Sequence, residues 1–109
     1  MIRVTVFNRQ ATAAPLSPVT SGSVGIPAEF VFSDDWESLT KTAVFKGSDE
    51  VQEVAVVDNA CEIPEEVLTE SGGMLWVGVY GADGQSDTVI PTNWALVGRI
   101  EEGTVLTTP

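Results

Sequence analysis

The chain has 109 residues, about the size of one domain. Sixteen Asp and Glu against five Lys and Arg give a net charge of −11, which argues against binding to nucleic acid or to anionic lipid, since both need basic groups. The single cysteine excludes an internal disulfide, and the absence of histidine excludes Ser-His-Asp and Cys-His nucleophiles and most zinc sites.

The first third of the chain predicts two strands and a turn. Residues 2–7 alternate apolar and polar side chains, which is typical of a strand with one buried face. Residues 9–24 are rich in Ala, Thr, Ser and Pro, and we predict a long loop or an extended arm that could reach a neighbouring molecule. Residues 26–32 alternate again, and residues 33–39 are predicted to turn around Trp36.

The remainder predicts further strands and one helix. In chain order we expect strands over 42–46 and 51–57, a helix over 64–70, and strands over 74–80, 87–91 and 94–100. A proline opens the helical segment and two glycines follow it, as at many helix ends. About seven short strands predict an all-β fold, a compact antiparallel β-sandwich with one short helix. A single domain over 1–103 would be followed by a tail over 104–109.

Three blocks carry a resemblance to a known family. They are SDDWESLTKTAVF at 33–45, WVGVYG at 76–81 and VIPTNW at 89–94. In this order they resemble a small domain at the N-terminus of tail-fibre-like and other structural proteins of phages and prophages of Gram-positive bacteria. The resemblance covers roughly residues 20–102 and implies a bacteriophage virion module without catalytic residues. It implies docking of a fibre or baseplate, or decoration of the particle.

The resemblance also implies where and with what the chain works. We expect a virion protein made in the host cytoplasm, with other phage structural proteins as partners. A homo-oligomer, for example a trimer, is expected because fibres are symmetric assemblies. No nucleic acid, membrane or cofactor is expected.

The aromatic residues are the main candidates for a binding surface. Trp76 and Tyr80 share one face of their predicted strand, with Gly78 between them, while the aliphatic residues of that strand point the other way. The aliphatic face is the better core, which leaves Trp76 and Tyr80 as an exposed platform for a partner. Trp94 and Leu96 share a face that we predict to be core.

The acidic turn around Trp36 has several interpretations. Asp34, Asp35 and Glu37 beside an aromatic ring are typical of a carboxylate pair in a sugar-hydrolysing site. The same three residues, or Asp83 with Ser86 and Asp87, offer hard oxygen ligands for calcium. The interpretation that we favour is structural, with Asp and Ser satisfying turn backbone groups while Trp36 packs inward. No enzyme, cofactor or metal is therefore predicted.

Two further functions stay open beside the virion module. A carbohydrate-binding module would use Trp76, Tyr80 and Trp36 as an exposed aromatic strip. An acidic inhibitor of a host defence protein would place carboxylates along one face at phosphate-like intervals. Cys61 stands next to Glu62 with no basic residue nearby in sequence, so we predict an unreactive apolar side chain.

Overall fold

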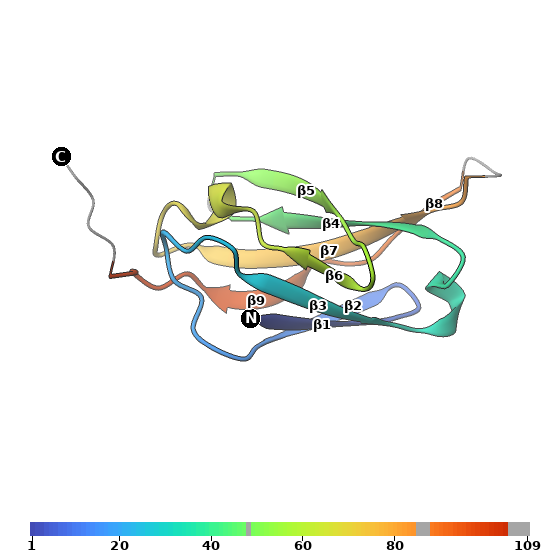
Figure 1. Cartoon of the computed structure of the whole chain (residues 1–109), viewed down its shortest axis with the longest axis horizontal. Helices are drawn as coiled ribbons and strands as arrows, with labels where there is room; N and C mark the ends of the chain where they lie inside the picture. The colour runs from blue at the N-terminus through green and yellow to red at the C-terminus, as the bar shows by residue number, and fades with distance from the viewer. Residues whose placement is uncertain (48, 85–87, 105–109) are drawn as a thin grey trace.

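Two β-sheets lie face to face in a computed structural model, which describes residues 1–47, 49–84 and 88–104 (Figure 1). The all-β sandwich predicted from the sequence is confirmed, and the helical content is limited to short turns. The described residues form nine strands rather than about seven, because part of the predicted loop 9–24 and a short segment, Ala60–Glu62, also pair. The molecule is elongated, with extents of 50 × 23 × 21 Å.

The first sheet has four strands in the order β2-β1-β3-β6. Their bounds are Ile2–Phe7 (β1), Gln10–Pro15 (β2), Pro27–Phe32 (β3) and Ala60–Glu62 (β6). β1 and β2 form a hairpin in which Phe7 is paired with Gln10. Asn8 has a φ of 55°, a left-handed conformation that asparagine tolerates better than most residues.

The second sheet has five strands, with β5, β4 and β7 in order and both β8 and β9 on the remaining edge of β7. Their bounds are Thr40–Lys46 (β4), Val51–Ala55 (β5), Met74–Ala82 (β7), Val89–Pro91 (β8) and Ala95–Arg99 (β9). All pairings in this sheet are antiparallel. The sequence also favours a hairpin turn at 81–86, and part of that segment lies outside the described residues.

The segment 9–24 differs from its prediction as a loop or arm. Residues Gln10–Pro15 are β2, and the following residues are held against their own chain. The Ser21 amide donates to the Glu101 carbonyl and the Gly22 amide to the Leu68 carbonyl, each at 2.8 Å. These contacts remove the basis for an arm that reaches a neighbour.

β1 and β3 are parallel, which the prediction of an antiparallel sandwich missed. The cause is β2, which reverses the chain so that Pro15 lies opposite Ile2. Residues 16–26 then connect to β3 at that same end, where Ala28 is paired with Ile2 from the other side. A strand that starts beside the start of β1 must run parallel to it.

Two 3₁₀ turns complete the fold, η1 at Asp34–Trp36 and η2 at Glu65–Leu68. η2 is the short helix expected after Pro64, and it buries Val67 and Leu68. η1 buries Trp36 at one end of the sandwich. There the Trp36 ring packs on Phe32 with centroids 5.5 Å apart, and Phe32 stacks on Phe30 at 5.8 Å.

The core lies between the two sheets and is built from alternate residues of each strand, as the pleat of a β-strand requires. Its largest fully buried side chains are Trp36, Phe45, Ile2, Ile63, Leu68, Leu75 and Ile100. The alternation predicted for β1, β3 and β7 is confirmed, since the side chains assigned to the inner face are buried or packed against the core.

Candidate interaction surface

The outward side of the five-stranded sheet, here called the outer face, carries the aromatic residues that the sequence singled out. Leu75, Val77 and Val79 of β7 are buried, which confirms the core side of this strand. Trp76 and Tyr80 lie on the opposite side and are half-buried. Strand register places Trp76 between Lys46 of β4 and Leu96 of β9.

Trp94 and Leu96 also belong to the outer face, and their prediction as core residues is wrong. Trp94 is 44% exposed and Leu96 is 47% exposed. The register pairs Ala95 with Val77, so that Ala95 and Val97 point inward instead. In an apolar run such as 94–97 either alternation fits a strand, and the smaller side chains take the inner positions at the sandwich edge beside β2.

The Trp94 ring contacts residues of two strands, β4 and β7. The Lys46 ammonium lies over this ring at 5.1 Å from its centroid. The ring also lies against Gly78 of β7, where a Cβ would be 3.5 Å from the ring, an ordinary contact distance. The ring is therefore fixed on the sheet while nearly half of the residue stays accessible.

The segment before Trp94 is anchored by two strands and a hairpin. The Val79 amide donates to the Thr92 hydroxyl at 3.0 Å, and the Thr92 amide donates to the Val79 carbonyl at 2.8 Å. Asn93 reaches the other sheet, where its side-chain Oδ1 accepts from the Ala11 amide at 2.8 Å. The Asn93 amide donates to the Arg9 carbonyl at 3.1 Å. These bonds place Trp94 with little freedom.

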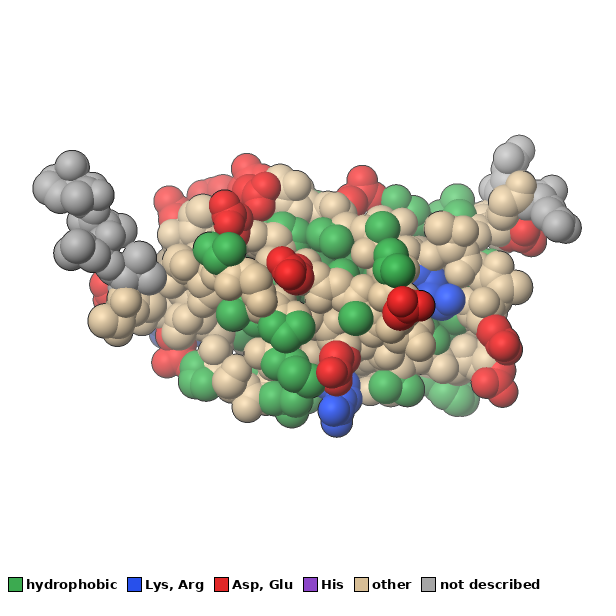
Figure 2. Space-filling model, viewed as in Figure 1, with side chains coloured by type: hydrophobic (Ala, Val, Ile, Leu, Met, Phe, Trp, Pro, Cys, Tyr) green, Lys and Arg blue, Asp and Glu red, His purple; other side chains and the backbone are tan. Residues whose placement is uncertain are grey.

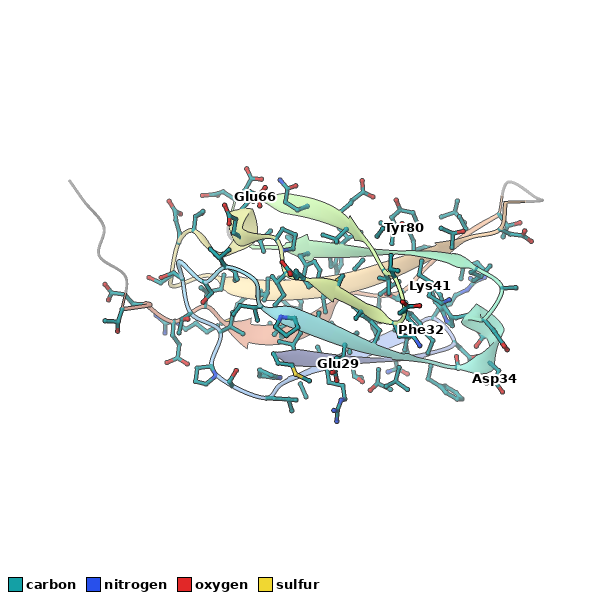
Figure 3. All side chains as sticks on the ribbon, viewed as in Figure 1. Glu29, Phe32, Asp34, Lys41, Glu66 and Tyr80 are labelled. Carbon is teal, nitrogen blue, oxygen red and sulfur yellow. The ribbon has the colours of Figure 1, made fainter. Side chains whose placement is uncertain are left out.

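Tyr80 lies further along β7 on the same face, and Figure 3 labels it. Its hydroxyl donates to Glu53 Oε1 across β4 at 2.6 Å. The hydrogen bond to this carboxylate raises the pKa of Tyr80, while a hydrogen bond with Thr42 acts in the opposite direction. Tyr80 thus serves as a neutral donor that occupies the Glu53 carboxylate.

The five-stranded sheet also differs from the rest of the chain in charge. Its strands carry three basic residues, Lys41, Lys46 and Arg99, and the single carboxylate Glu53. All other positions of the sequence hold two basic residues against fifteen acidic ones. The acidic residues outside these strands, where the structure describes them, lie in loops, turns and the four-stranded sheet.

Trp36 does not belong to the interaction surface, contrary to its assignment as a partner-binding residue. Its side chain is 1% exposed and its Nε1 donates to the Asn8 carbonyl at 2.5 Å. The structural interpretation of this turn fits instead, because the Ser33 hydroxyl donates to the Asp35 carboxylate and accepts from the Asn8 amide at 2.9 Å.

The acidic residues around η1 line a hollow of about 510 Å³ with Phe32 and Lys41. Asp34 and Glu37 line it together with Asp58, and the Lys41 ammonium lies 5.2 Å above the Phe32 ring. Within the described residues, no group of three or more acidic or cysteine side chains is close enough to hold a metal ion. Ser86 and Asp87, the calcium ligands considered with Asp83, lie outside the described residues.

Cys61 is half-buried in β6 and packs against the core. Burial raises the pKa of its thiol to about 11, and the nearby charge of Glu62 acts in the same direction. The geometry therefore fits the expected apolar role rather than a nucleophile.

Comparison with known proteins adds no assignment. No family model matches the chain, and no similar curated protein or solved structure is found. In the described part of the chain no helix is long and apolar enough to cross a membrane.

Proposed function

We propose that this chain is a non-catalytic docking module of a bacteriophage particle that binds another structural protein through the outer face. The observation that carries the proposal is the cluster of Trp94, Leu96 and Trp76 on a carboxylate-poor sheet of a protein with a net charge of −11. Interfaces favour tryptophan and are depleted of charge at their centre, because burying an unpaired charge is costly.

The rigidity of the face supports docking as well. Trp94 is held by Lys46 and by the anchored segment that precedes it. A side chain that is already ordered loses less conformational entropy on binding than a free one. Such a preformed aromatic anchor suits a partner that binds without rearrangement of the domain.

The particle context rests on the three sequence blocks and on where they lie. Residues 33–45 build η1 and most of β4, residues 76–81 lie within β7, and residues 89–94 include β8 and end at Trp94. All three blocks therefore contribute to the sheet that carries the outer face (Figure 1). If proteins that resemble this chain dock through the same sheet, the sequence features common to them should lie in that sheet, as these three blocks do.

The proposal places the protein in the virion, with other phage structural proteins as partners and without a role for nucleic acid or membrane. The homo-oligomer expected from the sequence stays a prediction. Its test is the solution mass of the purified chain by light scattering coupled to size exclusion.

The test of the docking function compares particles that carry the natural chain with particles that carry Trp94→Ser or Leu96→Ser. We expect mass spectrometry to find the natural chain in purified particles and to find each variant strongly reduced. Phe7→Ser is the matched control, because Phe7 is exposed on the opposite sheet. Absence of the natural chain from particles, or equal incorporation of all variants, would contradict the proposal.

The two other interpretations have distinct signatures in the same material. A carbohydrate-binding module would bind a glycan array through Trp76 and Tyr80, without any need for Trp36, which is buried. An acidic inhibitor would form a stable complex with a purified host nucleic-acid-binding protein and would be missing from particles.

A further inference from the structure

Acidic side chains border one end of the outer face, and this border bears on what binds there. At the end where the β4–β5 hairpin lies close to η2, Asp49, Glu50, Glu66 and Glu70 line one hollow of about 210 Å³. Figure 2 shows acidic side chains gathered over this end of the molecule, and Figure 3 labels Glu66 there and Asp34 at the opposite end.

The hollow lies past the end of β4, between the β4–β5 hairpin and η2. Val51 follows Glu50 directly, and register pairs it with Lys46, which in turn is paired with Trp76. A segment lying across Trp76 and Trp94 and continuing along the strands past Lys46 would arrive at the four carboxylates. These side chains are exposed, and their negative charges favour the approach of a positive group.

We propose, on the basis of the docking function above, that the occupant of the outer face is a protein segment with an apolar centre and lysine or arginine residues at one end. Its apolar side chains cover Trp76, Trp94 and Leu96, and its basic end lies against Asp49, Glu50, Glu66 and Glu70. The basic end of such a segment is attracted by the four carboxylates next to it. It is also attracted by the chain as a whole, which carries a net charge of −11.

A second copy of this chain fits the face less well. Two copies joined through their outer faces would each bring an acidic border and a net charge of −11 to the contact. Like charges brought together across an interface oppose association. The basic residues of the face do not compensate, since Lys46 is already placed over Trp94.

The experiment uses the full chain and two synthetic fluorescent peptides with the same apolar centre of leucine, tryptophan and isoleucine. One peptide ends in a run of lysines and the other in a run of glutamates. At low salt we expect the lysine peptide to bind at least about tenfold more tightly by fluorescence anisotropy, and its affinity to fall as salt is added. Equal affinities, or a preference for glutamate, would overturn the proposal.

Variants separate docking on the face from general attraction to an acidic protein. Trp94→Ser and Leu96→Ser should each weaken the lysine peptide at least about tenfold. The double variant Glu66→Gln/Glu70→Gln should weaken it about threefold or more, and Asp34→Asn/Asp35→Asn, which removes the same charge at the other end, should not. Equal losses from both charge variants, or no loss from Trp94→Ser, would overturn the proposal.

The outcomes also separate this inference from the docking function on which it rests. If Trp94→Ser abolishes incorporation into particles while Glu66→Gln/Glu70→Gln is incorporated normally, docking stands and the basic occupant is wrong. If light scattering finds a dimer that Trp94→Ser dissociates, the occupant is a second copy. If Trp94→Ser leaves incorporation unchanged, the docking function itself fails.

Discussion

The ammonium group of Lys46 lies 5.1 Å from the centre of the Trp94 ring. Lys46 ends β4 and Trp94 precedes β9, and β7 lies between these two strands. This contact spans the middle of the outer face, directly above Gly78. It joins a partly exposed aromatic ring to one of the five basic residues of the chain.

The first prediction concerns the energy of this contact. In a double-mutant cycle with Lys46→Met and Trp94→Leu, the coupling free energy should be about 0.5–1 kcal/mol, the range for a cation over a ring at an exposed site. Urea unfolding followed by circular dichroism measures it. A coupling near zero would mean that the two side chains do not stay together in solution.

A second prediction tests how tightly side chains pack at the η1 end of the sandwich. A Cβ at Gly81 would lie 2.7 Å from Leu39 and 2.9 Å from the Trp36 ring, so Gly81→Ala forces buried side chains apart. We expect a loss of about 1–3 kcal/mol in the free energy of unfolding. Gly84→Ala is the control, because nothing lies within 4 Å of its Cβ position, and it should leave stability nearly unchanged. Equal effects would refute a tight fit at Gly81.

The sandwich and most of its buried faces follow from the sequence because one side of the alternation in residues 2–7, 26–32 and 74–80 is continuously apolar, while the other side includes charged residues, glycine or tyrosine. Where both sides are apolar, as at Trp94 and Leu96, the pattern cannot choose, and the outcome depends on the register with β7. This register places the most exposed tryptophan on the surface. The sequence prediction therefore found Trp76 and Tyr80 but missed the residue at the centre of the face.

The pairing of β2 and the gathering of carboxylates near η2 could not be predicted from local sequence patterns either, because both depend on contacts between segments. Residues 10–15 have few good strand formers, and they become a strand because β1 offers an edge after a tight turn at Asn8. The four carboxylates near η2 come from two loops that are distant in sequence. Only one signal was readable beforehand, which is that the segments 40–46, 74–82, 89–91 and 95–99 contain no acidic residue.

A third prediction separates the two tryptophans by role. Trp36→Ala removes a side chain that is buried against Phe32 and bonded to the Asn8 carbonyl, and it should cost about 3–5 kcal/mol in the free energy of unfolding. Trp94→Ala removes a side chain that is 44% exposed and should cost clearly less. Thermal melts of both variants provide the comparison, and equal losses would contradict the assignment of Trp36 to the core and Trp94 to the surface.

The last prediction concerns the pH dependence of Cys61, whose thiol pKa is raised from 9.0 to about 11, mainly by burial. At about pH 8 the higher pKa reduces the thiolate population roughly a hundredfold, while the intrinsic nucleophilicity of that thiolate rises roughly tenfold. Alkylation by iodoacetamide should thus be about tenfold slower in the folded protein than in urea. The rate in the folded protein should keep rising to about pH 11, whereas the rate in urea should level off near 9.0.

The same shift has a consequence for stability, with a sign that follows from proton binding. Between pH 9.0 and about 11 the folded chain keeps the Cys61 proton while the unfolded chain loses it. The contribution of this thiol is therefore complete below pH 9.0 and is lost as the pH rises through about 11. Cys61→Ala should show a smaller decline over this range, and Tyr80 ionisation, common to both proteins, cancels in the comparison. Identical declines, together with an alkylation profile that levels off near 9.0 in the folded protein, would show that Cys61 is open to solvent and that β6 does not pack against the core as described.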